Sequence, residues 1–168
     1  MKKLSESFSY RTRALKNHIS ERFQGLKNLR GTRKMTVLVD SWSWIEYLKG
    51  TLPGEKVREV IENSTERVIV SAVNIAEVYK AFLRDFPYPK NEHLAEDSRA
   101  AIVQRSFVYD VDEEIAVESA RINHKMKLGL GNSIMYATAK REAAKVLTGD
   151  PHFKGVKDTI YLGELEVK

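Results

Sequence analysis

Residues 36–50 read TVLVDSWSWIEYLKG, and this stretch begins a pattern that recurs along the chain. Residues 37–39 form a short apolar run rich in β-branched side chains, which predicts a buried strand. Residues 44–49 predict a short helix that ends at Gly50. Asp40 lies between them, so its carboxylate would either emerge at the edge of a sheet or cap the helix that follows.

Short apolar runs alternate with helical patterns throughout residues 35–168. Strands are expected at residues 37–39, 68–70, 107–111, 146–148 and 159–162. Helices are expected at residues 44–49, 55–63, 74–86, 91–104, 112–127 and 132–143. This β-α alternation is typical of parallel strands joined by helices. It predicts an α/β fold with three layers, α/β/α, and a mainly parallel central sheet.

The composition fits one globular domain of ordinary core size. Of the 168 residues, 42% are hydrophobic and 30% are charged. The absence of cysteine excludes a disulfide framework, a thiolate zinc site and a cysteine nucleophile. No apolar run approaches the ~18 residues of a membrane span, so we expect a cytoplasmic protein without membrane contact.

Positive charge is concentrated in residues 1–34, which contain ten Lys or Arg against two Glu, a net charge of 10 − 2 = +8. Residues 35–168 contain 18 basic and 21 acidic residues, a net charge of −3. Apolar residues in the first segment recur mostly at three- or four-residue steps, which predicts a basic amphipathic helix preceding the domain at 35–168. This helix either grips a phosphate backbone or a partner, or packs loosely on the domain. Alternatively, Met35 is the true start of the protein.

Four polar residues occupy equivalent places near the predicted strands. Asp40 and Asp150 follow strands directly. Glu77 lies about one turn into the helix after residues 68–70, and Asn132 begins the helix before the strand at 146–148. Because ligands bind beyond the carboxyl ends of parallel strands, we expect these side chains to converge. Each acid also has a structural explanation when it is taken singly, as a helix cap, a turn residue or a surface residue.

A converging set of three carboxylates favours a bound cation. Like charges repel, so the cluster persists best when a cation neutralises it. Oxygen ligands without cysteine or paired histidines favour Mg²⁺ or Mn²⁺ over zinc. A cation of this kind activates water and orients a phosphate, which makes phosphodiester hydrolysis the expected reaction.

From about residue 36 to residue 162, the chain resembles the PIN domain, a nuclease fold that includes the VapC-type toxins of toxin-antitoxin pairs. The resemblance rests on four motifs in their order along the chain: VLVDSWSWIEYLKG, VSAVNIAEVYKAF, LGLGNSIMYATAK and VLTGDPHFKGV. It implies a PIN-like fold over residues 35–168 and a metal-dependent endoribonuclease that acts on RNA. It further implies a homodimer and an antitoxin that inserts a segment near the acidic cluster.

The motifs assign roles to individual residues. Asp40, Glu77 and Asp150 match the metal-binding acids of the family, and with Asn132 they form the expected catalytic set. Asn132 falls where the family usually has aspartate, and His152 where many relatives have a further acid. We interpret Asn132 both as a helix cap and as a weakened ligand, because an amide oxygen coordinates Mg²⁺ but cannot ionise. Loss of metal chemistry would instead leave a non-catalytic RNA- or protein-binding module.

Basic residues flank three of the four motifs and are candidate contacts for RNA phosphates. These are Lys80, Arg84, Lys125, Lys127, His152 and Lys154. In an acidic domain, the same lysines and arginines are equally explained as ordinary solvated charges. A loop position accounts for His152 without any function, although it is also suited to contact a phosphate or to act as an acid.

Overall fold

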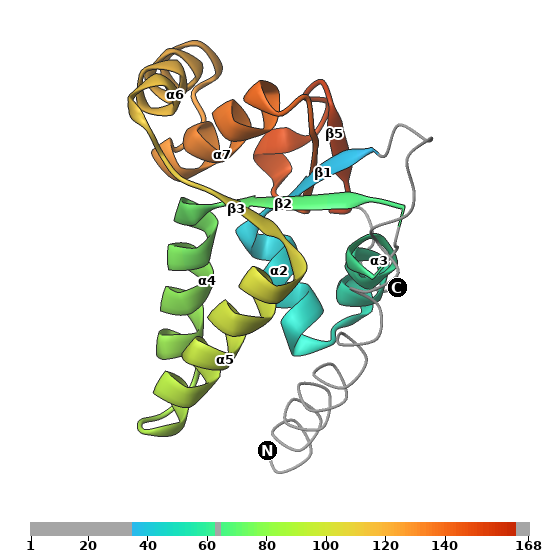
Figure 1. The fold of residues 1–168 in the computed structure, drawn as a ribbon, viewed down its shortest axis with the longest axis vertical. Helices are drawn as coiled ribbons and strands as arrows, with labels where there is room; N and C mark the ends of the chain where they lie inside the picture. Colours follow the sequence, from blue (N-terminus) through green and yellow to red (C-terminus); the bar gives the residue numbers. More distant parts are fainter. Residues whose placement is uncertain (1–34, 63–64, 164–168) are drawn as a thin grey trace. The chain divides into compact units, whose positions relative to one another are not determined.

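The computed structural model describes residues 35–62 and 65–163. The helix predicted within residues 1–34 lies outside the described residues. The elements are β1 (Thr36–Val39), α2 (Ser41–Lys49), α3 (Leu52–Ile61), β2 (Arg67–Ser71), α4 (Ala72–Asp85), α5 (Lys90–Arg105), β3 (Phe107–Tyr109), α6 (Glu113–Met126), α7 (Leu130–Arg141), β4 (Lys145–Thr148), the 3₁₀ helix η2 (Pro151–Phe153) and β5 (Thr159–Tyr161) (Figure 1). All the predicted strands and helices in this part of the chain are present, and their ends shift by at most three residues.

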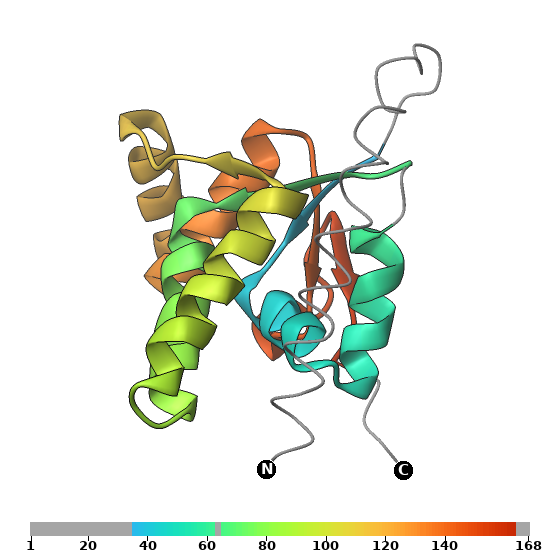
Figure 2. The ribbon, with the colours of Figure 1, turned by 60° about the horizontal axis from the view of Figure 1, so that its bottom comes forward.

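The five strands form one parallel sheet in the order β3-β2-β1-β4-β5. Helix α7 packs against β1, β2 and β4, and α6 packs on α7. Helices α2 and α3 pack together on the opposite face of the sheet (Figures 1 and 2). The predicted three-layer α/β/α fold is therefore confirmed. None of the helices in the described residues has the length and apolar character of a membrane span.

Apart from their first residues, the three inner strands β2, β1 and β4 are buried on both faces, which is why they are almost continuously apolar. Leu38, Ile69 and Val146 belong to the core that faces α6 and α7. Their neighbours along the strands, such as Val39 and Leu147, are equally buried, because alternate side chains point to opposite faces. The buried core thus holds the carboxyl ends of β1, β2 and β4 in fixed positions.

Helices α2 and α3 approach each other closely at Gly54. A Cβ atom at this position would lie 2.2 Å from the carbonyl oxygen of Glu46 and 3.0 Å from the amide nitrogen of Tyr47. Both are backbone atoms of α2, so a side chain at residue 54 would force the two helices apart. This contact helps to fix α2, which follows Asp40 directly.

We predict that Gly54→Ala lowers the free energy of unfolding by roughly 1–3 kcal/mol, the usual cost of overpacking a tight contact. Gly129→Ala is the matched control, because no atom lies within 4 Å of a Cβ at residue 129. Its effect should stay below about 1 kcal/mol. Urea unfolding of both variants measures the difference, and equal losses would contradict the close approach of α2 and α3.

Candidate active site

Asp40 links the end of β1 to the start of α2 and is only 4% exposed. Its Oδ1 accepts a hydrogen bond of 2.7 Å from the backbone N–H of Ser43, so it caps α2. Its Oδ2 accepts a hydrogen bond from the hydroxyl of Thr148, at the end of β4. The predicted capping role is therefore confirmed, and the same carboxylate also joins the ends of the adjacent strands β1 and β4.

Burial raises the pKa of Asp40 from 3.8 to about 6, because desolvation disfavours the charged form. Hydrogen bonds from Thr148 and Ser43 oppose this shift, and the negative charge of Asp150 adds to it. At neutral pH the side chain is thus an ionised carboxylate with little hydration. A nearby positive charge would stabilise it.

Thr148 connects Asp40 to Asp150. Its hydroxyl donates to Asp40 and accepts a 2.9 Å hydrogen bond from the backbone N–H of Asp150. Asp150 in turn caps η2, where its Oδ1 accepts from the backbone N–H of His152 at 2.9 Å and lies 2.7 Å from Nδ1 of the same residue. Sequence reasoning missed Thr148, although its hydroxyl at the end of an apolar strand, two residues before an acid, is a recognisable signal.

Asn132 lies within α7 and does not cap it. The helix begins at Leu130 with Gly129 as its N-cap, so Asn132 is the third helical residue. The prediction that Asn132 opens and caps this helix is wrong, because the helix begins two residues earlier, at Leu130, with Gly129 as its N-cap. The Asn132 side chain instead donates a 2.7 Å hydrogen bond from Nδ2 to Oδ2 of Asp150.

The surroundings of Asp150 determine its ionisation. Its partial burial alone would raise the pKa of its carboxyl, but hydrogen bonds from His152 and Asn132 outweigh that effect and lower the pKa. Asp150 is therefore a stable carboxylate whose two oxygens both have partners.

Glu77, the sixth residue of α4, reaches the site from a helix. Its Oε2 accepts a 2.5 Å hydrogen bond from the hydroxyl of Ser41, the first residue of α2. Its Oε1 lies against Gly131, where a Cβ atom would be only 2.5 Å away. The glycine thus lets α7 approach the carboxylate. Sequence reasoning identified Glu77 but not its partner Ser41.

The sequence profile of the PIN domain matches residues 37–158. This chain belongs to the PIN domain family. The predicted resemblance is thereby confirmed, and members of this family are typically nucleases that use divalent metals.

Solved structures share the fold at low sequence identity. A chain of a toxin-antitoxin complex from Klebsiella pneumoniae is 20% identical, with a TM-score of 0.62 over 75% of this chain and 97% of that chain. VapBC2 from Rickettsia felis, bound to a DNA fragment from its promoter, matches with 13% identity and a TM-score of 0.58, covering 76% and 97%. VapC20 from Mycobacterium tuberculosis, a sarcin-ricin loop cleaving toxin, matches with 12% identity and a TM-score of 0.59, covering 72% and 95%. No curated protein matches this chain.

Asp40 and Asp150 lie near enough for the charge of Asp150 to raise the pKa of Asp40, and Glu77 comes from a third element; all three acids are held by hydrogen-bond donors. In residues 35–62 and 65–163, no three acidic or histidine side chains form a group that could hold a metal ion as they stand. Ser41 engages Glu77, and Asn132 and His152 engage Asp150. Even so, oxygen donors around the poorly hydrated Asp40 suit Mg²⁺ or Mn²⁺ in kind and in charge.

The candidate RNA contacts of the PIN domain lie on exposed surfaces. Arg84 on α4 bonds Asp85 at 2.7 Å, so part of its charge is already compensated. Lys125 and Lys127 lie at the end of α6, with Lys127 as its C-cap. Their contact with RNA, like that of Lys80, His152 and Lys154, stays a prediction.

We predict that Asp40→Asn stabilises the metal-free protein at neutral pH. Because the pKa of Asp40 is raised from 3.8 to about 6 in the folded state, the folded protein holds this proton more tightly than the unfolded chain. Stability is therefore lost as the pH rises from about 4 through 6. At pH 7 with a chelator, the variant should gain roughly 1–3 kcal/mol in the free energy of unfolding, and the gain should vanish near pH 4. Urea unfolding at both pH values measures this, and a less stable variant at pH 7 would contradict the burial argument.

Proposed function

We propose that this chain is a divalent-metal-dependent endoribonuclease of the VapC type, with a catalytic set made of Asp40, Glu77, Asn132 and Asp150. The observation that carries the proposal is the buried Asp40 carboxylate, which is joined through Thr148 to Asp150 at the carboxyl ends of adjacent parallel strands. This is the edge of a parallel sheet at which ligands bind. Membership of a nuclease family supports the same reaction.

Asp40, Glu77 and Asp150 are the residues that would hold Mg²⁺ or Mn²⁺. Their oxygen donors and combined negative charge fit either ion. When bound, such an ion supplies activation of water and stabilisation of charge on the scissile phosphate. The chain's own residues limit the rise in the pKa of Asp40 through hydrogen bonds from Thr148 and Ser43, orient Asp150 through His152, and hold Glu77 beside Ser41.

Asn132 affects both the metal affinity of the site and its rate of cleavage. Its amide group donates to Asp150 and cannot ionise, so the site has one negative charge fewer than an aspartate would give it. We expect weaker metal affinity and slower cleavage than in an Asn132→Asp variant. The same hydrogen bond supports a second candidate function, a non-catalytic module that binds RNA or protein, because it satisfies the acid without a metal.

RNA is the proposed substrate, and an antitoxin is the proposed protein partner. Several similar structures are described as toxin-antitoxin complexes, which supports a partner of this kind. A homodimer and a cytoplasmic location complete the proposal, and both rest on the family.

The direct test is cleavage of a mixed RNA pool with Mn²⁺ or Mg²⁺. We expect the wild type to cut, Asn132→Asp to cut faster, and Asp40→Asn to lose at least about a hundredfold in rate, because it removes the buried charge of the site. Asp97→Asn is the matched control, because Asp97 is an exposed acid on α5 and should leave the rate unchanged.

Two results would contradict the proposal in different ways. Equal cutting by wild type and Asp40→Asn would place the reaction elsewhere or assign it to a contaminant. No cutting by any variant, with RNA or protein binding retained, would favour the non-catalytic module.

The basic segment at residues 1–34 is proposed to strengthen RNA binding through its net charge of +8. Deleting residues 1–33 should lower RNA affinity and flatten its dependence on salt, because fewer counterions are released from RNA on binding. Filter binding at several salt concentrations measures both quantities. An unchanged salt slope would show that this segment is not a nucleic-acid arm.

A further inference from the structure

An exposed apolar stretch lies at the β3 edge of the sheet. In the strand order β3-β2-β1-β4-β5, this edge is three strands away from β4, which precedes Asp150. Strand β3 is a terminal strand of the sheet, and among residues 35–62 and 65–163 it pairs only with β2. Phe107 is 60% exposed, and both Val108 and Val111 are 39% exposed. Phe107 and Val108 are consecutive strand residues, so their side chains point to opposite faces, and neither face is fully covered.

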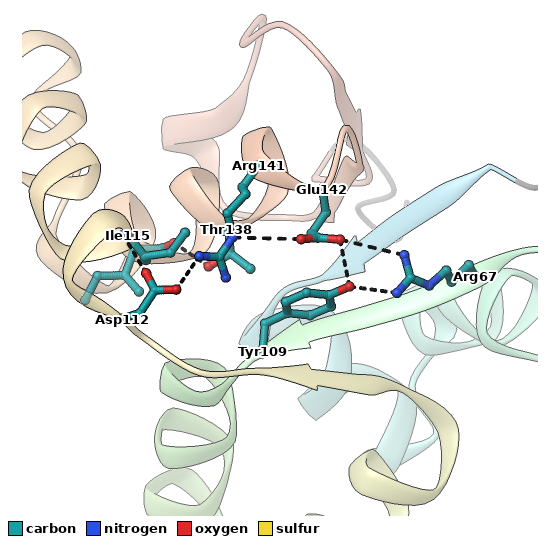
Figure 3. A network of polar contacts seen from close by, with 8 residues as sticks. Arg67, Tyr109, Asp112, Ile115, Thr138, Arg141 and Glu142 are labelled. Carbon is teal, nitrogen blue, oxygen red and sulfur yellow. Dashed lines mark hydrogen bonds and ion pairs between the residues drawn. The ribbon is translucent and has the colours of Figure 1, made fainter.

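A polar network holds residues 107–114 through the side chains of Tyr109 and Asp112 (Figure 3). Arg67 on β2 donates a 2.7 Å hydrogen bond to the hydroxyl of Tyr109, which donates a 2.7 Å hydrogen bond to Glu142. Asp112 caps α6 and also pairs with Arg141. These contacts hold the backbone of the segment. The Arg67 guanidinium also lies over the Phe107 ring, 5.0 Å from its centroid, whereas Val108 and Val111 lie outside the network.

The same segment carries uncompensated negative charge. Asp110, Glu113 and Glu114 are exposed, and within the part of the chain that the structure describes they form no ion pair. Glu113 and Glu114 suit the first turn of α6, but Asp110 lies before the helix and has no such explanation. We define the β3–α6 surface as Phe107, Val108, Asp110, Val111, Glu113 and Glu114.

The negative charges of Asp110, Glu113 and Glu114 indicate which kind of partner this surface binds. An open strand edge with exposed apolar side chains is a common site of strand addition by another chain. A second copy of this chain, related by two-fold symmetry, would present the same surface, so that two negatively charged surfaces would face each other. A segment rich in Lys or Arg would instead pair with them, and its apolar residues would cover Phe107 and Val111.

We propose that the β3–α6 surface binds an extended, basic segment of a protein partner, in which Lys or Arg alternates with large apolar residues. The segment lies beside β3 as an added strand. Its backbone pairs with the open edge, its apolar side chains contact those of the surface, and its cations meet Asp110, Glu113 and Glu114.

The probe is a synthetic peptide of about nine residues in which Lys and Val alternate, with a fluorescent label. Fluorescence anisotropy measures its binding to the full-length protein. A peptide of alternating Glu and Val, and one of alternating Lys and Ser, test charge and apolar contact separately. We expect the Lys–Val peptide to bind at least about tenfold more tightly than either control, and less tightly as salt is raised.

Surface variants locate the binding. Val111→Ser and Asp110→Asn should each weaken the Lys–Val peptide several-fold, and together by about tenfold or more. Both positions lie between β3 and α6, where the loss of an exposed side chain should leave the fold intact. Leu52→Ser and Asp97→Asn are matched controls at exposed positions on other helices and should bind as the wild type does. Thermal melting verifies that every variant is folded.

Binding that responds to the surface variants and not to the controls would establish the proposal. It is overturned if the peptide does not bind, or if it binds all variants equally. It is also overturned if the wild type sediments as a dimer that Val111→Ser dissociates, because the surface would then hold a second copy. The readout does not involve RNA cleavage, so its failure leaves the proposed nuclease untouched.

Discussion

The buried carboxylate of Asp40 is the constraint on which the rest of the site depends. A charge that is 4% exposed is costly unless it is paired or hydrogen-bonded. Ser43 and Thr148 each donate one hydrogen bond, and these two bonds do not fully compensate the lost hydration, since the pKa stays raised to about 6. The fold therefore places an ionised and poorly solvated oxygen pair where a cation would be favourable.

The parallel sheet and two helices position the remaining groups. Adjacent strands β1 and β4 end side by side, so Asp40 and Asp150 need only Thr148 between them. Glu77 and Asn132 arrive on helices α4 and α7, which meet where Gly131 leaves room for the Glu77 carboxylate. In this arrangement Asn132 serves as a hydrogen-bond donor to Asp150, which is a role that an aspartate could fill only if it were protonated.

The sequence predicted the elements of the fold because apolar runs and helical spacing are local signals, and it placed Asp40 and Asp150 at strand ends because each follows an apolar run closely. It did not predict the partners of those acids. The bonds from Thr148 to Asp40 and from Ser41 to Glu77 join residues that are 108 and 36 positions apart, so they depend on the packed structure. The start of α7 was misjudged because Asn132 is a good capping residue, whereas the helix begins at Leu130 with Gly129 as its N-cap. The order of the strands in the sheet also could not be predicted from local patterns. The strand beginning at residue 107 was expected, but its exposed position at the edge of the sheet was not.

The most direct test of the central claim, that Asp40 and its neighbours form a cation site, is the melting temperature of the full-length protein at pH 7 with and without Mn²⁺. A ligand that binds only the folded state raises the melting temperature through linkage. The structure predicts a rise for the wild type that increases with Mn²⁺ concentration and is lost in Asp40→Asn, while Asp97→Asn responds as the wild type does. No rise in the wild type, or the same rise in Asp40→Asn, would contradict the account.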